Sequence, residues 1–242
     1  MADDGARPKV QDGDVRAPAA AAAAARARAS SHGPKRILCL DSPGARAGVQ
    51  LGLLAALEER LAKRSFFSAF KLCDYFDLIV GAGVGAYFAA ELARGRRVAD
   101  IDVAFAQIGP DLVYKRDPAA LEGGLAGLFG DAKLRGAPWR SGFATFLKRR
   151  SDGAVLFATD RAPPEPEALV ARVLTAATAA PGKLDSEKVT LSAGGAVAPY
   201  VDAAAAGLAD PALALMHALV AQRGGYAWSI GPDRTLLVSL GA

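Results

Sequence analysis

Three short segments carry the residue types that could do chemistry, and each directly follows an apolar run typical of a buried strand. They span residues 41–48, 81–85 and 201–204, and they contain Asp41, three closely spaced glycines and Asp202. Open α/β sheets bind ligands in the crevice outside the carboxyl ends of their strands. Glycine-rich turns and strand-end aspartates are common individually. The order of the three segments is the stronger signal, and it predicts one shared site at a sheet edge.

The motifs in these segments are Asp41-Ser42-Pro43-Gly44-Ala45-Arg46-Ala47, Gly81-Ala82-Gly83-Val84-Gly85 and Asp202-Ala203-Ala204. Their order resembles that of the patatin-like lipid acyl hydrolases, whose pattern is D-G-G-G-x-R-G, then G-x-S-x-G, then a late D-G-[GA]. Connecting stretches such as "GVQLGLLAALEERL" and "TLLVSLGA" are also similar to patatin segments. The likeness covers roughly residues 36–242. Glycine in place of the elbow serine resembles a plant subgroup of the family.

The resemblance implies a Ser-Asp dyad, in which an elbow serine attacks an ester carbonyl and an aspartate removes its proton. Asp202 matches the base. The nucleophile position falls on Gly83, which has no side chain to attack with. Glycine keeps the turn, because it adopts a positive φ freely. We therefore expect a degenerate dyad with weak or absent hydrolysis of lipid acyl esters, and no cofactor.

The loop that would bind the oxyanion also departs from the family pattern. The resemblance places two N–H donors within Pro43-Gly44-Ala45-Arg46, with Gly44 and Ala45 as the expected oxyanion hole, but Pro43 has no N–H, so one donor of the family pattern is missing. The remaining motif positions are Asp41, Arg46, Gly81 and Gly85, and Arg46 is expected to fix the start of the following helix rather than to act in catalysis. Loss of one such donor costs about 10² to 10³ in rate in other acyl-transfer enzymes.

Two routes could restore some hydrolysis. Asp202 could activate a water directly as a general base. Alternatively, Ser42 could replace the missing nucleophile, although ordinary turn hydrogen bonding is the favoured role for a serine in this loop.

Two rival functions remain open. The chain could be a catalytically silent lipid-binding or regulatory relative that keeps the fold. It could also be a dinucleotide-binding domain, because residues 81–86 fit G-x-G-x-x-A after a strand, with Asp100 or Asp102 about twenty residues further on. Against a dinucleotide site, a complete strand-helix unit precedes the glycines.

The elements that must position these residues alternate between strand and helix, which predicts an α/β sandwich of three layers around a mostly parallel central sheet flanked by helices. Strands are expected at 35–41, 75–81, 154–160, 198–203 and 234–240, and helices at 49–61, 86–95, 165–180 and 210–222. Residues 98–150 are predicted to form short helices broken by glycine and proline. Two apolar stripes are predicted to face the core: Val49, Leu53, Leu54, Leu57 and Leu61, with Glu58 on the outer face, and Leu213, Leu215, Met216, Leu219 and Val220.

Composition excludes several classes of function. The chain has 242 residues and a net charge of +4, and the basic run Lys148, Arg149 and Arg150 is typical of a solvated face, with contact to anionic lipid headgroups as the sharper alternative. No nucleic-acid motif is present. The two histidines, His32 and His217, are too few for a multi-histidine metal centre, and neither is placed in a Ser-His-Asp triad.

Location and domain limits follow from the same composition. Cys39 and Cys73 form no C-x-x-C motif and are expected to be reduced, buried thiols. No apolar run is long enough to cross a bilayer. We predict a cytoplasmic protein that meets membrane lipids peripherally. Residues 1–33 are predicted to form a disordered Ala-rich tail before one domain at 34–242. The family's chains continue further, which raises the hypothesis that this domain is truncated at its C-terminus.

Overall fold

The computed structural model describes residues 27–28, 30–65, 69–114, 117–136, 139–149, 154–159, 168–180, 190–193, 196–204, 207–221 and 228–241. Most of the predicted tail at 1–33 lies outside these residues. At its end, the guanidinium of Arg28 donates hydrogen bonds to the backbone carbonyls of Cys73 at 3.1 Å and Arg140 at 3.3 Å. This contact joins the segment just before the first strand to the backbone at Cys73 and Arg140.

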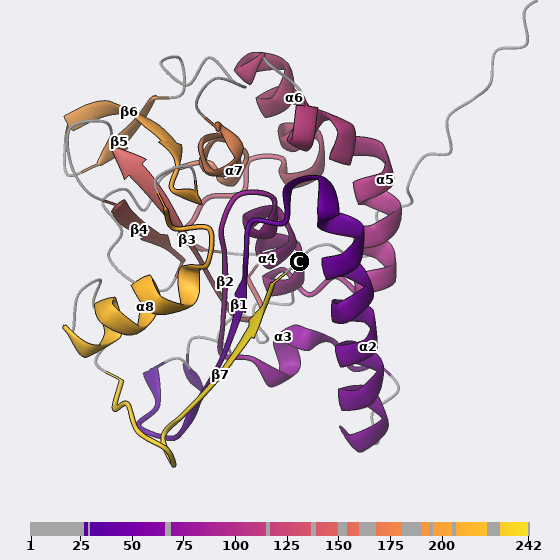
Figure 1. Ribbon diagram of the computed structural model, residues 1–242, viewed down its shortest axis with the longest axis vertical. Coiled ribbons are helices and arrows are strands. Elements are labelled where there is room, and N and C mark those ends of the chain that lie inside the picture. The colour runs from indigo at the N-terminus through magenta and orange to yellow at the C-terminus, as the bar shows by residue number, and fades with distance from the viewer. Residues whose placement is uncertain are drawn as a thin grey trace, which may run out of the picture.

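Helices and strands are interspersed along the chain, although several follow an element of the same kind (Figure 1). The strands are β1 (Lys35–Leu40), β2 (Leu78–Gly81), β3 (Gly142–Arg149), β4 (Ala154–Ala158), β5 (Thr190–Ala193), β6 (Ala196–Asp202) and β7 (Thr235–Leu240). The helices are α2 (Ala47–Ser65), α3 (Leu72–Tyr75), α4 (Val84–Ala93), α5 (Val98–Tyr114), α6 (Pro118–Phe129), α7 (Val170–Thr178) and α8 (Pro211–Val220), and a 3₁₀ turn, η1 (Gly44–Arg46), leads into α2. The five expected strands and four expected helices outside 98–150 are therefore present within the described residues, although the strand expected at 75–81 begins only at Leu78, because Tyr75 belongs to α3.

The strands form one sheet in the order β5-β6-β3-β2-β1-β7, with β4 paired to β3. Strands β7, β1, β2 and β3 are parallel to one another, whereas β4 and β6 are antiparallel to β3. Figure 1 shows α2, α4 and α5 on one side of the sheet and α8 on the other. The predicted three-layer α/β sandwich is confirmed.

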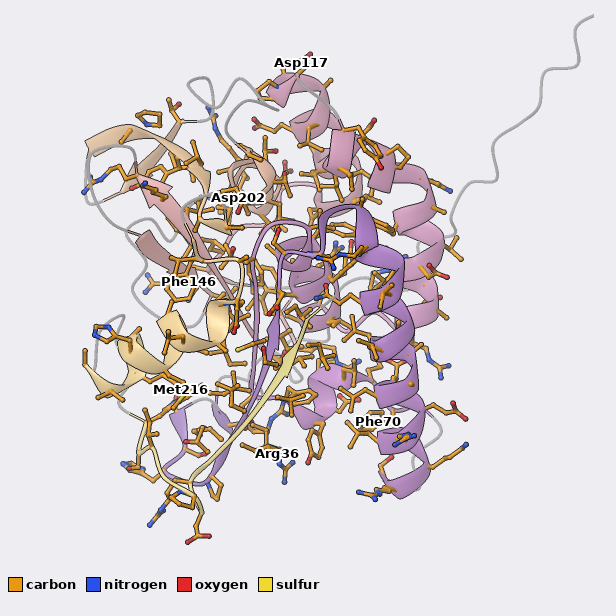
Figure 2. The ribbon with its side chains drawn as sticks, viewed as in Figure 1. Arg36, Phe70, Asp117, Phe146, Asp202 and Met216 are labelled. Carbon is orange, nitrogen blue, oxygen red and sulfur yellow. The ribbon has the colours of Figure 1, made fainter. Side chains whose placement is uncertain are left out.

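Side chains of β1 alternate between two hydrophobic clusters, as the period of a strand requires. Ile37 and Cys39 face the cluster that contains α8, whereas Leu38 and Leu40 face the cluster built around α4. Figure 2 shows Phe146 of β3 on the α8 side. Both faces of the parallel sheet are therefore covered, as is usual for such sheets.

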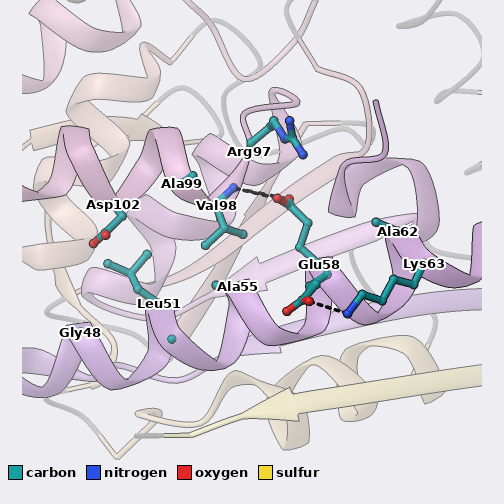
Figure 3. Close-up of a pocket in the computed structure, with 12 residues that line it drawn as sticks. Gly48, Leu51, Ala55, Glu58, Ala62, Lys63, Arg97, Val98, Ala99 and Asp102 are labelled. Carbon is teal, nitrogen blue, oxygen red and sulfur yellow. Dashed lines mark hydrogen bonds and ion pairs between the residues drawn. The ribbon is translucent and has the colours of Figure 1, made fainter. Parts of the chain in front are cut away.

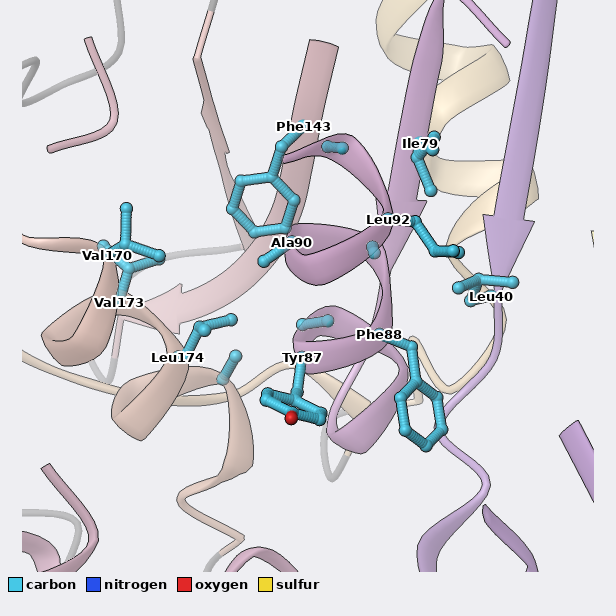
Figure 4. Packing of buried hydrophobic residues seen from close by; sticks show 14 of the residues in the cluster. Leu40, Ile79, Tyr87, Phe88, Ala90, Leu92, Phe143, Val170, Val173 and Leu174 are labelled. Atoms are coloured by element: carbon cyan, nitrogen blue, oxygen red, sulfur yellow. The ribbon is translucent and has the colours of Figure 1, made fainter. Parts of the chain in front are cut away.

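Every residue of α4 is buried, which fits a helix that is apolar apart from Glu91, whose carboxylate is paired with Arg94 and Arg96. Figure 4 shows α4 between the sheet residues Leu40 and Ile79 and the side chains of α7. Tyr87 and Phe88 of α4 are fully buried. Complete burial of one such side chain stabilises a fold by about 1.5–3 kcal/mol. The helix that follows the glycine turn is thus fixed rigidly in the core.

The prediction of short broken helices across residues 98–150 is wrong in two places. Helix α5 continues through Pro110 as one 17-residue helix, and residues 142–149 form the central strand β3. The apolar residues Phe143, Phe146 and Leu147 have the i, i+3, i+4 spacing of a helix face. They belong instead to a strand buried on both faces, whose pattern cannot be distinguished from a helix by periodicity alone. The short strand β5 was also not predicted.

The predicted core face of α2 is wrong in part. Val49 and Leu53 are 57% and 43% exposed, whereas Leu54 of the predicted stripe is buried, together with Gln50, Leu51 and Glu58, which were not expected to face the core. The carboxylate of Glu58 accepts hydrogen bonds from the backbone N–H of Val98 at 3.3 and 3.4 Å (Figure 3). Val98 is the first residue of α5, so the carboxylate satisfies a helix N-terminus that sequence patterning could not place opposite it.

The predicted stripe on α8 is also wrong in part. Leu215 and Leu219 are buried against the sheet, but Leu213 is 79% exposed and Val220 is 69% exposed. The helix has only one neighbouring layer, so one side of its apolar surface remains uncovered by the described residues.

Candidate functional site

The strand register explains why the glycine turn and Asp202 meet. A strand has two edges, and residues 144–145 of β3 pair with both β2 and β4, which places those two strands on opposite edges. Residues 147–148 of β3 pair with both β4 and β6. Strand β6 therefore lies on the same edge of β3 as β2.

Strands β2 and β6 consequently approach one another end to end. Gly81, at the end of β2, is opposite Thr145, and Asp202, at the end of β6, is opposite Leu147. Two residues along a strand correspond to about 7 Å. The chain must leave the sheet between these two points, and it does so at Gly83. Figure 2 shows Asp202 at the end of the sheet where β1 and β2 give way to helices.

The glycines before and after Gly83 permit this sharp exit because their backbones are in direct contact with neighbouring segments. A Cβ on Gly81 would overlap the backbone of Gly85, and a Cβ on Gly85 would overlap the carbonyl oxygen of Asp41 and lie 2.8 Å from that of Leu40. The end of β1, the end of β2 and the start of α4 are therefore packed backbone to backbone. This packing supplies a physical reason for glycine at both positions.

Gly83 precedes α4 with φ +53° and ψ −130°, a backbone conformation that residues other than glycine adopt only under strain. A Cβ built on Gly83 would lie 3.5 Å from Oδ2 of Asp202. The same Cβ would overlap the hydroxyl oxygen of Ser42 and lie 2.9 Å from the Ser42 Cβ. A side chain at position 83 would thus point at the Asp202 carboxylate, into space that Ser42 already fills.

Asp202 is held firmly at the end of β6. Its side chain is buried, with Oδ1 accepting a hydrogen bond from the N–H of Ala204 at 2.8 Å. Its backbone N–H donates to the carbonyl of Ala179, just after α7, at 3.2 Å. The second carboxylate oxygen, Oδ2, is the one that faces the Gly83 turn.

The loop after β1 carries Ser42 into the site. The N–H of Ser42 donates to the carbonyl of Ala209 at 2.9 Å. The buried amide of Gln50 donates to the carbonyls of Asp41 at 3.2 Å and Leu240 at 2.9 Å, which ties this loop to the end of β7. Gly44 has φ +54°, and this turn redirects the chain into η1. The loop is therefore positioned by three different segments.

These residues surround a cavity of about 90 Å³. Its walls are formed by Ser42, Gly44, Gly83, Val84, Leu112, Val113, Thr178, Ala180 and Asp202. A cavity of this size accommodates a few water-sized groups, well below the roughly 300–1,000 Å³ of a pocket that encloses a whole ligand. It suits the reacting part of an ester rather than a complete lipid.

The predicted site residues divide into three groups. Gly44, Gly83 and Asp202 line the cavity. Gly81 and Gly85 are buried beneath the turn and shape it without lining the cavity, whereas Ala45 and Arg46 are exposed on η1. The cavity-lining residues of α5 and α7, such as Leu112 and Thr178, were not identified from the sequence. No local motif could have found them, because only the packing of these helices brings them to the sheet edge.

Asp41 does not line the cavity. Its pKa is raised above the ordinary value, chiefly by burial and then by the nearby charge of Asp210, while a hydrogen bond from Ser239 partly opposes this. Oδ1 of Asp41 is buried and has no hydrogen-bond partner among the described residues. Asp41 is therefore a structural part of the loop, held next to a second carboxylate.

Other titratable groups lie outside the cavity. Burial raises the pKa of both free cysteines, Cys39 and Cys73, to about 12, so these thiols are poor nucleophiles. His32 and His217 are exposed. Within the described ranges, no group of three or more histidine, cysteine or acidic side chains could hold a metal ion. None of the helices described is long and apolar enough to cross a membrane.

The arrangement disfavours the dinucleotide alternative. Asp100 and Asp102 lie exposed on α5, whereas a ribose-binding acid follows about twenty residues after the glycines in a βαβ unit, near the end of the next strand. Here α4 is followed directly by another helix. A larger cavity of about 580 Å³ lies between α2 and α5 (Figure 3), but the glycine turn is not part of its lining.

Comparison with known proteins gives partial matches. No protein-family model matches the chain. The cGAMP-activated phospholipase of Vibrio cholerae serotype O1 is 35% identical over 85 residues, which is 34% of this chain and 24% of the relative. The cGAMP-activated phospholipase of Escherichia coli strain TW11681 is 34% identical over 81 residues, which is 34% of this chain and 23% of the relative.

The chain thus spans about a quarter of the length of the curated relatives it matches. Over about a third of the chain, these matches support the resemblance to patatin-like phospholipases. Both relatives are bacterial, and they give no support to the plant subgroup.

Proposed function

We propose that this chain is a patatin-like lipid acyl hydrolase domain with a degenerate Ser-Asp dyad, acting weakly on acyl esters at the membrane surface. The observation that carries the proposal is the direction of residue 83, whose Cβ would face Oδ2 of Asp202 at 3.5 Å. This is the approach that an elbow nucleophile and its base require. The phospholipase names of the two relatives support the same reaction class.

The rest of the cavity fits ester chemistry. Gly44 and Val84 belong to the first turns of η1 and α4, where backbone N–H groups have no partner within the helix and favour negative charge. Such groups can stabilise the oxyanion of a tetrahedral intermediate. Leu112 and Val113 give the cavity an apolar wall next to the reacting carbonyl. We propose that the remaining lipid stays outside this small cavity.

The proposal includes a cytoplasmic protein that meets lipids peripherally, because both cysteines are free and buried. It does not include the plant subgroup. A lipid-binding relative without catalytic activity is the alternative, favoured by the absence of a side chain at position 83 and by Pro43, which removes a backbone donor.

The geometry around Gly83 decides which variant can distinguish the hydrolase from the lipid-binding relative without catalytic activity. Gly83→Ser alone is blocked, because the new Cβ would overlap the Ser42 hydroxyl. The informative protein is the double variant Ser42→Gly with Gly83→Ser, assayed for fatty acid release from phosphatidylcholine vesicles. We expect weak release by the unaltered chain and a gain of about 10²-fold or more in the double variant, given that removing such a serine costs on the order of 10⁶.

Adding Asp202→Asn to the double variant should abolish the gain, because the base would be lost. Adding Pro43→Gly should increase the gain further by restoring one donor, which is worth about 10² to 10³ in related chemistry. If neither the unaltered chain nor a double variant with a cooperative thermal transition releases fatty acid, with or without Pro43→Gly, the hydrolase proposal is contradicted and the silent relative is favoured.

A further inference from the structure

The side chain of Ser42 occupies the place of the missing nucleophile. A Cβ on residue 83 would overlap the Ser42 hydroxyl oxygen, and that same Cβ position is 3.5 Å from Oδ2 of Asp202. Ser42 and Asp202 both line the same cavity. The loop after β1 therefore places a hydroxyl group, that of Ser42, where the side chain of residue 83 would lie.

We propose that Ser42 is the nucleophile of this chain and that Asp202 is its base. The proposal rests on the proposed function, because it names the reacting group of the same acyl hydrolase site. It also reverses the role expected for this serine from the sequence, where turn hydrogen bonding was favoured. Within the described residues the Ser42 hydroxyl is not engaged in a turn hydrogen bond, nor is it hydrogen-bonded to Asp202, so the proposal requires the two groups to come within hydrogen-bond reach when an ester binds.

The surrounding contacts hold Ser42 in place without engaging its hydroxyl. Its backbone N–H is bonded to Ala209, and the carbonyl of the preceding Asp41 accepts a hydrogen bond from Gln50. Ser42 is only partly buried, so the oxygen is accessible from the cavity. A fixed backbone and an accessible hydroxyl are two requirements of a preorganised nucleophile, and the carboxylate of Asp202 in the same cavity supplies the base.

The chemistry balances with groups already in the cavity. Oγ of Ser42 bonds to the ester carbonyl carbon while Oδ2 of Asp202 takes the hydroxyl proton, and the carbonyl electron pair moves onto oxygen. Collapse of this intermediate breaks the bond to the leaving alcohol, which receives the proton from Asp202 and leaves an acyl-serine. Water then attacks the acyl carbon and gives a proton to Asp202, which returns it to Oγ as the fatty acid departs.

A fluorophosphonate probe tests this assignment, because it forms a stable bond with an activated serine hydroxyl and the modified peptide is identified by mass spectrometry. The full chain and four variants are labelled side by side: Ser42→Ala, Asp202→Asn, the double variant Ser42→Gly with Gly83→Ser, and Ser65→Ala as a matched control at the end of α2. We expect label on Ser42 in the unaltered chain and in Ser65→Ala.

The variants give separate outcomes for the two proposals. Labelling and fatty acid release should each fall at least tenfold in Ser42→Ala and in Asp202→Asn, while all variants keep a cooperative thermal transition. Label on another serine, or undiminished labelling of Ser42→Ala, overturns the assignment of Ser42. An unlabelled natural chain with label at position 83 of the double variant also overturns it, but leaves the proposed hydrolase site standing. Folded proteins that all remain unlabelled overturn both proposals.

Discussion

Ser42 and Gly83 cannot both carry an ordinary side chain in this fold, because a Cβ on residue 83 would overlap the Ser42 hydroxyl. The two residues lie on loops that follow neighbouring parallel strands, β1 and β2. Relative to the patatin-like pattern that the chain resembles, one loop carries a side chain, that of Ser42, in place of a glycine, and the other carries Gly83 in place of a serine. Because both side chains would occupy the same space next to the ends of β1 and β2, the effect of a substitution at one position depends on the residue at the other.

This coupling is measurable as stability. Gly83→Ala should lower the free energy of unfolding by about 1–3 kcal/mol, from backbone strain at φ +53° together with the overlap with Ser42. In a Ser42→Gly background the same substitution should cost less, since only the backbone strain remains. Urea unfolding of the two single variants and the double variant gives the coupling directly. Strictly additive effects would show that Ser42 moves aside at no cost.

Gly85 should tolerate substitution even less. A Cβ at this position would lie 2.8 Å from the carbonyl oxygen of Leu40 and would overlap that of Asp41, and backbone atoms in a central strand cannot move aside. We expect Gly85→Ala to cost about 3 kcal/mol. Gly127→Ala in α6 is the matched control, because no atom lies within 4 Å of its Cβ position.

Gly127→Ala should stabilise the protein by about 0.5–1 kcal/mol, since glycine is unfavourable inside a helix. Equal effects of Gly85→Ala and Gly127→Ala on the unfolding midpoint would contradict the close approach of β1 and α4.

The two cysteines should be inert in the folded chain. Burial raises the pKa of each thiol to about 12, so almost none is present as thiolate at pH 8. Reaction with a disulfide reagent such as DTNB should be negligible in buffer and should reach both thiols once urea unfolds the chain. Rapid reaction of either cysteine below the unfolding transition would show that its strand or helix opens locally.

Asp41 should make stability depend on pH. Its raised pKa means that the folded chain binds a proton at a higher pH than the unfolded chain does. The stabilising contribution is complete below the unfolded pKa of about 3.9 and is lost as the pH rises through the folded pKa. Asp41→Asn should remove this loss, so its unfolding free energy relative to the unaltered chain should increase between pH 4 and pH 7.

The control for this prediction is Asp102→Asn, because Asp102 is exposed on α5. It should leave the difference between pH 4 and pH 7 unchanged. Parallel stability curves for Asp41→Asn and the unaltered chain would show that Asp210 and burial do not act on Asp41 as inferred.

Much of the fold was predictable because its signals are local. The strand at 35–40 and the helix that ends near Ala93 are each marked by apolar runs bounded by glycine or by charged residues. Strand β3 was missed because a strand buried on both faces has no alternating pattern to reveal it. Glu58 was placed on the wrong face because its partner, the N–H of Val98, lies forty residues away in sequence.

The sequence by itself determined the chemistry that is missing: position 83 has no nucleophilic side chain, and Pro43 has no N–H. It also determined which turns carry the candidate residues, because glycine and aspartate after apolar runs are local features. Only the tertiary structure decided that β6 meets β2 end to end on one edge of β3. That pairing brings Asp202 to the Gly83 turn and leaves the intervening space to Ser42, since the positions of side chains across a sheet depend on register and packing rather than on neighbours in sequence.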